Sequence, residues 1–524
     1  MKKLSLIMIS MAIMSSCSKT ALQPTASEAN PTLSVGKSSK ALTNGPGTNY
    51  FVNGATGSDT NTGLSTSVPL KTIQAALNKT TEGAAATINV LAGTYSERIS
   101  FPHSGASSAA PIAVTNYSGA AVYLDGTSTN SGSNTNMVTI ASKSHVRLNG
   151  ITIQNDIMSF ANGIAVTGSG TDVQINACSI HNVGWTTSMT AVPTSSNNAH
   201  ALFVEGTSST AYSNVYIGYN TIYSCATGYS EALSLTGNVK DFLIEHNVVH
   251  DITNIGIDMS GHYSYTTAPD SVNFARGGNV NYNTVYNCVS PVATSGGIYV
   301  DGGSYINIQG NTCYANGAGI TVGCENNNYT ATQINVRDNF IYNNVTAGII
   351  YGSNQANSKV TYSTLSGNTF YNNFSQGGYG GEVEYQNTDH LNVFDNIIQS
   401  RSNVVVIALS GYTSTNLTMN YDDYYTSSGS SGTITFDWGG INSGGYYSFA
   451  NFQSGTGLEA NGLYNIPGFI TASLPTPNLH LTSTSACLNR GLPGYTAASG
   501  ELDIDSQARV QNSRVDIGAD ETAY

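Results

Sequence analysis

The chain has 524 residues, and its 55 glycines, 32 tyrosines and 9% charged residues suit many short strands joined by tight polar turns. Lysine and arginine total 18 against 31 acidic residues, so the net charge of −13 argues against nucleic acid and anionic membrane surfaces as partners. The same charge makes a strongly anionic polymer an unfavourable substrate.

The N-terminus has the pattern of an export signal, because two lysines precede an apolar run over residues 4–13. The run ends in MSSC, which resembles a bacterial lipobox and implies that Cys17 carries a lipid. An ordinary signal peptide cleaved nearby is the alternative. We therefore expect a lipoprotein signal peptide over residues 1–17 and an exported protein. By resemblance to Gram-negative sorting signals, Ser18 directs it to the outer membrane or cell surface, with the lipid as its only membrane contact.

Residues 18–48 are rich in Ser, Thr, Ala and Pro and predict a flexible tether. The following sequence predicts a strand, a Gly- and Asp-rich loop, a short helix over Thr72 to Leu77, and a second strand ending in AGTY. This order resembles the opening of extracellular right-handed parallel β-helix proteins of the pectin-lyase-like type, in which the helix caps the end of the coil. Asp59 and Asn61 in the loop could hold a structural Ca²⁺ ion, although a plain Asx turn is the simpler interpretation.

An asparagine recurs from about residue 149 onward at spacings typical of one coil of a β-helix. The recurring positions, separated mostly by 27 to 29 residues, are Asn149, Asn176, Asn220, Asn247, Asn283, Asn311, Asn339, Asn368 and Asn396. We expect these side chains to form a ladder inside a turn and to satisfy buried backbone groups. The two longer spacings predict insertions near 184–200 and 262–275.

The sequence thus predicts an all-β chain, a right-handed parallel β-helix over residues 49–420 with a β-rich C-terminal cap over residues 421–524. A tyrosine three places after many of the asparagines predicts a stacked stripe on one face. The six cysteines beyond Cys17 lie at apparent core positions and include no CxxC motif, so we expect neither disulfides nor a metal site. We expect a monomer.

Two carboxylates mark the candidate active site, in the sequence GGIYVDGGSYINIQGNTCYANGAGITVGCENN. With Ile298 and Ile320 facing the core, Asp301 and Glu325 both face outward on adjacent coils. Their Cα atoms are expected about 8 Å apart, a spacing from which two carboxylates can flank one glycosidic bond. Asp and Asn also end β-helix strands merely as turn formers, which is the structural alternative for Asp301.

Further residues are predicted to belong to the same face. Asp258 follows the core-facing Ile257 by one residue and Glu205 follows Leu202 by three, so both are expected on this outward face, and Asp258 is a third candidate catalytic carboxylate. The residues predicted to contact a carbohydrate substrate are Glu205, Tyr299, the second-insertion residues His262, Tyr263, Tyr265 and Arg276, and Trp185 of the first insertion.

The segment around Asp301 and Glu325 resembles the active-site coils of β-helical β-xylosidases among glycoside hydrolases. The resemblance implies that Asp301 is the nucleophile and Glu325 the general acid/base, without a cofactor; Gly302 stands where such sites often have tryptophan. A polysaccharide lyase or epimerase acting on a uronic-acid polymer is the alternative, with Asp258 and Asp301 holding Ca²⁺ and Arg276 or His262 acting as base. A third interpretation is a non-catalytic glycan-binding surface protein.

Overall fold

A computed structural model describes residues 46–130, 132–376, 381–401, 405–409, 414–426, 434–439 and 445–523. Cys17, the predicted signal peptide and nearly all of the tether lie outside these ranges, so lipidation and export stay predictions. Within the described ranges, no helix combines the length and the apolar character that a membrane crossing requires.

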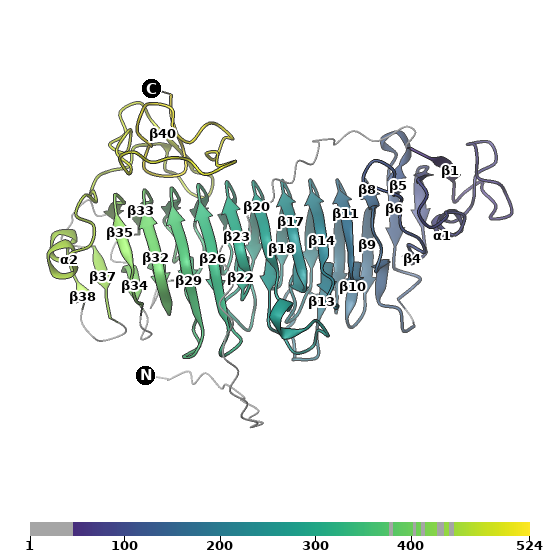
Figure 1. Ribbon diagram of the computed structural model, residues 1–524, viewed down its shortest axis with the longest axis horizontal. Helices are drawn as coiled ribbons and strands as arrows, with labels where there is room; N and C mark the ends of the chain where they lie inside the picture. Colours follow the sequence, from purple (N-terminus) through teal and green to yellow (C-terminus); the bar gives the residue numbers. More distant parts are fainter. Residues whose placement is uncertain are drawn as a thin grey trace.

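The chain forms a right-handed parallel β-helix in which each coil adds one strand to each of three long sheets (Figure 1). Sheet A contains β1 (Thr48–Val52), β2 (Ala86–Val90), β5 (Ile112–Asn116), β8 (Val146–Asn149), β11 (Gly170–Asn176), β14 (Tyr212–Gly218), β17 (Val239–Glu245), β20 (Arg276–Asn281), β23 (Ser304–Gln309), β26 (Thr330–Arg337), β29 (Lys359–Ser366), β32 (Thr388–Phe394) and β35 (Thr418–Asn420). Sheet B contains β3 (Gly93–Tyr95), β6 (Val122–Asp125), β9 (Thr152–Ile157), β12 (Ser179–Gly184), β15 (Thr221–Cys225), β18 (Val248–Ile252), β21 (Thr284–Cys288), β24 (Thr312–Tyr314), β27 (Phe340–Tyr342), β30 (Thr369–Tyr371), β33 (Ile397–Ser400) and β36 (Asp423–Thr426). Sheet C contains β4 (Ile99–Ser100), β7 (Asn136–Ala141), β10 (Ala161–Gly168), β13 (Ala199–Gly206), β16 (Leu233–Gly237), β19 (Ile257–Ser260), β22 (Gly296–Asp301), β25 (Ala318–Gly323), β28 (Ala347–Tyr351), β31 (Gly381–Tyr385), β34 (Val405–Leu409), β37 (Thr435–Asp437) and β38 (Gly445–Tyr446). A separate pair consists of β39 (Phe469–Thr471) and β40 (Asn478–Leu481), and the short helices are η1 (Tyr117–Gly119) and η2 (Asp270–Val272).

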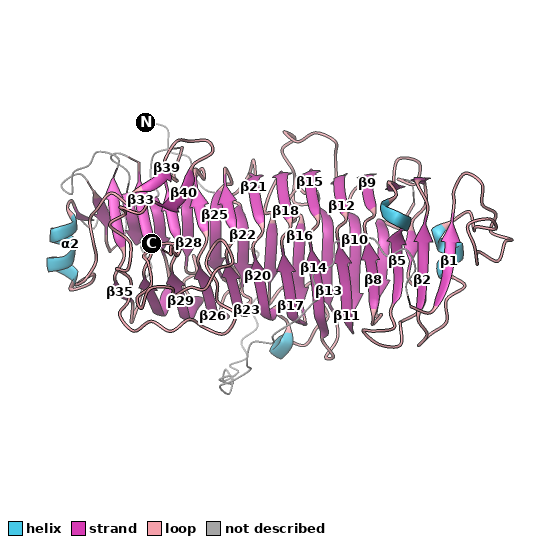
Figure 2. Cartoon of the chain, turned by 90° about the horizontal axis from the view of Figure 1, so that it is seen from above, coloured by secondary structure: helices cyan, strands magenta, loops and turns pink. Residues whose placement is uncertain are grey.

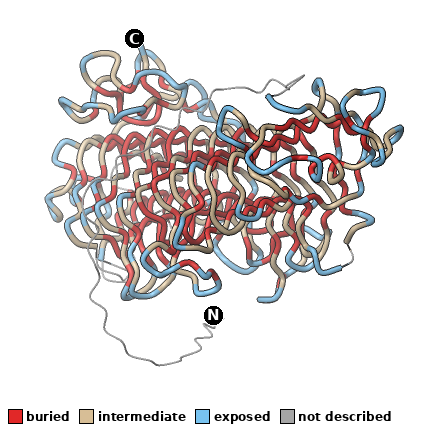
Figure 3. The backbone as a smooth tube through the Cα atoms, turned by 45° about the vertical axis from the view of Figure 1, so that its right-hand side comes forward, coloured by how far each residue is buried: buried red, intermediate tan, exposed pale blue. Residues whose placement is uncertain are grey.

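The core runs along the inside of the coil, where Ile, Val and Leu from equivalent strand positions stack on one another. Ile257, Ile298 and Ile320, for example, are register partners on β19, β22 and β25, and all three are fully buried. Since side chains alternate between the two faces of a strand, the residues between them point outward. Buried backbone follows the coils, whereas exposed residues concentrate in the connecting loops (Figure 3).

The predicted asparagine ladder lies at the turn between sheets A and B. The Nδ2 of Asn311 donates to the Oδ1 of Asn339 at 3.0 Å and to the Val280 carbonyl at 2.8 Å. Equivalent side-chain bonds connect all the asparagines from Asn220 to Asn396. The ladder ends on a carboxylate, because Asn396 donates to Asp422.

The first two predicted members do not belong to the ladder. Inside sheet A, Asn149 is the register partner of Asn176, and Asn176 is the register partner of Gly218, two residues before the ladder position. Cys178 stands at that position, and its backbone N–H donates to the Oδ1 of Asn220. At these two coils the predicted repeat is present, but the predicted asparagines lie two residues before the ladder position. An apolar side chain stands at the ladder position in place of an asparagine amide.

The N-terminal end is closed by α1 (Ile73–Leu77), which confirms the predicted helix. Ile73 and Leu77 are buried against the first coil, and Thr72 caps the helix. Asp59 accepts hydrogen bonds from the backbone N–H groups of Lys71 and Thr72. Its contacts in this structure are therefore those of a loop and cap residue.

The β-helix continues beyond residue 420, the predicted boundary. Strand β36 pairs with β33, and β37 pairs with β34, so the coil extends to Asp437. The helix α2 (Phe449–Thr456) then closes this end, with Phe452 stacked on Phe436 at 4.3 Å. Aromatic residues in this stretch obscured the strand pattern in the sequence.

The chain after α2 folds back beside the β-helix instead of extending its end (Figures 1 and 2). Leu479 and Ala519 pack on Phe340, Tyr342 and Tyr371 of sheet B. Much of this segment is loop, with β39 and β40 as its named strands. It therefore covers the sheet B side of the β-helix.

Candidate active site

Asp301 and Glu325 lie on adjacent coils at the C-terminal edge of sheet C, as predicted. Strand β22 pairs with β25 so that Asp301 is opposite Gly323, and Glu325 follows two residues later. The backbone N–H of Glu325 donates to the Oδ1 of Asp301 at 2.7 Å. The two carboxylates are therefore fixed relative to each other by the backbone of the second coil.

The turn after Asp301 depends on Gly302, whose φ is +81°. Its N–H donates to the Gly323 carbonyl at 2.8 Å, and a Cβ at this position would lie 3.1 Å from the His262 ring. Residues with a side chain rarely adopt this backbone conformation. The backbone conformation therefore favours glycine at residue 302, the position where the β-xylosidases that the sequence resembles often have tryptophan.

Two tyrosine hydroxyls bind the pair. Tyr299 lies on β22 and donates to the Oε1 of Glu325 at 3.0 Å. Tyr263 comes from the insertion after β19 and donates to the Oδ2 of Asp301. Asn273 holds this part of the loop by donating to the Tyr263 carbonyl at 2.9 Å. Tyr263, which was predicted as a substrate contact, is thus a direct hydrogen-bond partner of Asp301.

The electrostatic setting of the pair is unfavourable for negative charge. Burial, followed by repulsion from Glu325, raises the pKa of Asp301 to about 7, although hydrogen bonds from Tyr263 and the Glu325 N–H oppose the shift. Glu325 keeps an exposed side chain, yet the protein around its carboxylate raises its pKa, while hydrogen bonds from Tyr299 and Tyr263 lower it. The pKa of Tyr263 is raised by burial and by the neighbouring carboxylates, so its phenol stays protonated.

Asp258 lies one coil earlier and faces the same outer side, because its register partners are Ser234 and Tyr299. It is 3% exposed, and its Oδ1 has no hydrogen-bond partner among the described residues. Burial raises its pKa well above the usual value, with further contributions from Glu231 and Asp301. Burial therefore favours the protonated form of Asp258.

The other predicted substrate contacts divide into two groups. Tyr265 and Glu205 remain on the outer side of sheet C, where Tyr265 is 61% exposed and Glu205 is half-buried. His262 is sandwiched between Tyr329 and Phe274, with ring centroids at 4.1 Å and 5.3 Å. Burial lowers the pKa of His262 to about 4, so it is neutral under ordinary conditions.

Arg276 and Trp185, which were predicted as substrate contacts, lie away from the carboxylate pair. The Arg276 guanidinium donates to Asn238 and to the carbonyls of Val272 and Phe274, at the start of a sheet A strand. Trp185 follows β12, and its N–H bonds to Ala226 ahead of β16. The first insertion therefore emerges at the edge of sheet C opposite Asp301.

The sequence interpretation missed one carboxylate. Glu231 precedes β16, and its Oε2 lies 3.6 Å from the Nε2 of His200. It contributes to the raised pKa values of Asp258, Asp301 and Glu325. Alternation gave no signal for it, because a residue two places before the core-facing Leu233 is expected to face the core as well.

Metal-binding geometry lies elsewhere. Among the described residues, one group of His, Asp, Glu or Cys has ligand atoms within 4.8 Å of one another, and it consists of His480, Asp505 and Asp520 in the C-terminal segment. The carboxylates of Asp258 and Asp301 do not form such a group with a third ligand.

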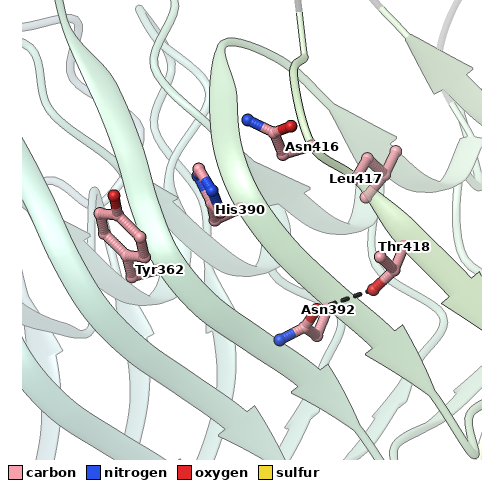
Figure 4. A pocket seen from close by; sticks show the side chains of 6 residues that line it. All are labelled: Tyr362, His390, Asn392, Asn416, Leu417 and Thr418. Atoms are coloured by element: carbon pink, nitrogen blue, oxygen red, sulfur yellow. Dashed lines mark hydrogen bonds between the residues drawn. The ribbon is translucent and has the colours of Figure 1, made fainter.

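A pocket of about 440 Å³ lies on the outside of sheet A, away from the carboxylate pair. It is lined by Tyr362, His390, Asn392, Asn416, Leu417 and Thr418 (Figure 4). Thr418 donates to Asn392 at 2.7 Å, and the Tyr362 ring stacks on His390. The six residues that line it include no carboxylate.

Sequence comparison assigns the chain to a family. It is 31% identical over 444 residues to the uncharacterized protein YwoF of Bacillus subtilis (strain 168), and the match covers 82% of this chain and 90% of YwoF. The chain belongs to the YwoF family. No protein-family model matches it.

Solved structures similar to this YwoF relative are distant in sequence. Pectate lyase Pel9A is 14% identical, with a TM-score of 0.46 and coverage of 92% of this chain and 98% of the lyase. The GH136 lacto-N-biosidase from Eubacterium ramulus is 11% identical, with a TM-score of 0.43 and coverage of 72% and 64%. The alginate lyase from Paenibacillus sp. str. FPU-7 is 16% identical, with a TM-score of 0.43 and coverage of 59% and 95%.

Proposed function

We propose that the protein is a glycoside hydrolase that uses Asp301 and Glu325 to cleave a neutral or weakly charged glycan. The observation that carries the proposal is the hydrogen-bonded arrangement of the pair, in which each carboxylate also accepts a tyrosine hydroxyl. Glycosidic hydrolysis needs one carboxylic acid and one carboxylate near the same bond. A structural turn residue needs no such partners.

The pair is suited to hold one proton at neutral pH, because burial raises both pKa values, with added repulsion from Glu325 on Asp301 and from Glu231 on Glu325. We assign protonation of the leaving oxygen to Glu325, whose side chain is exposed and can reach a substrate. Asp301 then acts across the sugar, either as nucleophile or as the base that activates water. The Tyr263 hydroxyl donates a hydrogen bond to Asp301 and opposes the rise in pKa of both carboxylates, so it favours their charged forms while the insertion is closed.

Access to Asp301 is controlled by the insertion after β19. Asp301 is 2% exposed, and Tyr263 from this insertion bonds directly to it. A sugar therefore contacts Asp301 only when the Tyr263 side chain moves aside. The binding of substrate and the opening of this loop are linked in the proposed reaction.

A lyase or epimerase acting on a uronic acid is less well supported by the same residues. Such enzymes need a base and a positive group that neutralises the uronate. Here the Arg276 guanidinium is hydrogen-bonded to Asn238 and backbone carbonyls, and His262 is enclosed by two aromatic rings. The raised pKa of Tyr263 keeps its phenol protonated, so it is a poor base. The third interpretation is glycan binding without catalysis, in which the protein binds a glycan and releases no product.

The N-terminal sequence supports a cell-surface location. The lipobox-like MSSC ending at Cys17 and the tether that follows it would place the β-helix outside the cell, anchored by lipid. A hydrolase there meets extracellular polysaccharides. Labelling with a radioactive fatty acid, abolished by Cys17→Ala, tests the anchor.

The function is tested by incubating the protein with a panel of neutral, amino and uronic-acid glycans. Wild type is compared with Asp301→Asn, Glu325→Gln and the control Glu384→Gln, which changes an outward carboxylate three strands farther along sheet C. New reducing ends in wild type and the control, lost in the two variants, support hydrolysis. Appearance of an unsaturated uronate product would instead establish β-elimination, and unchanged binding without any product would leave a glycan-binding protein.

A further inference from the structure

The outer side of sheet C beside the catalytic pair carries more carboxylates than the proposed reaction requires. Glu205, Glu231 and Asp258 lie on or next to β13, β16 and β19, on the coils that precede Asp301. We call these three residues the acidic surface. A histidine lies beside it: the Nε2 of His200 is 3.6 Å from the Oε2 of Glu231, and its Nδ1 is 3.1 Å from the Oδ1 of Asn162.

Asp258 is the part of this surface that most clearly lacks a partner. Its side chain faces the same side as Ser234 and Tyr299, and it is 3% exposed. Its Oδ1 is buried without a hydrogen bond among the described residues. A buried polar atom without a partner costs free energy, so a ligand that donates a hydrogen bond there is favoured.

An exposed aromatic ring stands over the acidic surface. Tyr265 is 61% exposed, stacks on Tyr263 at 5.3 Å, and its hydroxyl lies 3.3 Å from the Oγ1 of Thr236. Thr236 is the register partner of Glu205 on the neighbouring strand. Burial first, and then repulsion from Glu231, Asp258 and Glu205, raises the pKa of the Tyr265 hydroxyl.

We propose that this acidic surface binds the ammonium group of an amino sugar, so that the glycan cleaved contains 2-amino-2-deoxyhexose residues with free amines. The inference rests on the proposed function for its position next to Asp301 and Glu325. An ammonium donates three hydrogen bonds and compensates the negative charge of Glu205 and Glu231. It also supplies a donor to Asp258, while the Tyr265 ring packs on the sugar and its cation.

Binding tests this without depending on turnover. Using the full-length Glu325→Gln variant, the affinity for a β-linked glucosamine tetramer is measured by calorimetry beside its fully N-acetylated form and a galacturonate tetramer with Ca²⁺. We expect the amino tetramer to bind about tenfold more tightly than the acetylated one at low salt, and the difference to shrink in high salt.

A second substitution then locates the effect. Adding Glu231→Gln is expected to lower the affinity for the amino tetramer by roughly threefold to tenfold and to leave the acetylated tetramer unchanged, since only the charged contact is removed. Glu384→Gln is the matched control and should change neither affinity. Thermal melting of each variant shows whether it remains folded.

Equal affinity for both tetramers, no binding of either, or tighter binding of galacturonate with Ca²⁺ would each overturn the amino-sugar inference. The proposed function fails separately, when no glycan of the panel is hydrolysed by wild type. Hydrolysis of neutral glycans with no preference for free amines would leave that function standing and remove the inference alone.

Discussion

The backbone N–H of Glu325 and the carboxylate of Asp301 are joined by a 2.7 Å hydrogen bond across two coils of the β-helix. One carboxylate is thus positioned by the peptide bond that carries the other. Movement of either coil would change both at once, because Asp301 ends β22 and Glu325 follows the paired strand β25 by two residues.

Tyr263→Phe tests the role of the phenol between the carboxylates. The ring and its stacking on Tyr265 are kept, and only the hydroxyl bound to Asp301 is lost. We expect kcat/KM to fall about 10- to 100-fold with little change in melting temperature, because the pKa of Asp301 rises further when its hydrogen bond to the phenol is lost, while packing is kept. Tyr265→Phe, which removes a hydroxyl outside the pair, is the matched control. Equal kcat/KM for Tyr263→Phe and wild type would exclude a role for the phenol in setting the charge of Asp301.

The stability of the protein should fall as pH rises from about 4 to 7. Burial first, and repulsion from Glu325 second, raises the pKa of Asp301 to about 7, so the folded chain holds a proton that the unfolded chain releases near pH 4. This contribution is complete below the unfolded pKa and is lost on approaching the folded one. For Asp301 alone it amounts to at most about 4 kcal/mol.

Melting temperatures measured across this pH range check the sign. Asp301→Asn cannot ionise, so its melting temperature should decline less between pH 4 and pH 7 than that of wild type. Other buried carboxylates with raised pKa values, such as Glu382, keep part of the decline in both proteins. A steeper decline in the variant would contradict the assignment.

The asparagine ladder predicts a large cost for one truncation. Asn311 donates to Asn339 and to the Val280 carbonyl, and it accepts from Asn283. Asn311→Ala leaves these buried groups unsatisfied and should destabilise the fold by roughly 2 to 4 kcal/mol. Chemical denaturation compared with the exposed Asn392→Ala measures the effect. Equal midpoints for the two variants would mean that the ladder contributes nothing to stability.

Gly302→Ala tests the turn that orients Asp301. A methyl group at φ +81° strains the backbone and presses on the His262 ring, which we expect to cost about 1 to 2 kcal/mol. Because the strain falls next to Asp301, we expect a larger loss of activity than the loss of folding stability alone would cause. The comparison is Gly457→Ala in the C-terminal cap, where φ is +73° and a Cβ meets open space. Full activity in Gly302→Ala would show that the turn does not set the pair.

The sequence predicted those features that follow from a period. The spacing of the asparagines and the alternation around Ile298 and Ile320 fixed the coils, and with them the relation of Asp301 to Glu325. A repeat constrains residues within it, because each coil must stack on the next.

Contacts made by insertions and by the returning C-terminal segment were beyond that pattern. Tyr263 reaches Asp301 from a loop that does not belong to the repeat. The contact of Arg276 with Asn238 could not be predicted from the repeat either. Trp185 was misplaced because an insertion of known length does not reveal which edge of a sheet it leaves. The packing of Leu479 on sheet B depends on residues far apart in sequence.

The most direct test of the carboxylate pair is a double-mutant comparison on a glycan that the wild-type protein cleaves. The kcat/KM values of wild type, Asp301→Asn, Glu325→Gln and the double variant are measured together. Residues that act as one unit are non-additive, so each single variant should lose roughly a thousandfold or more and the double variant little beyond that. Single variants that keep near wild-type activity would show that the pair is not the catalyst.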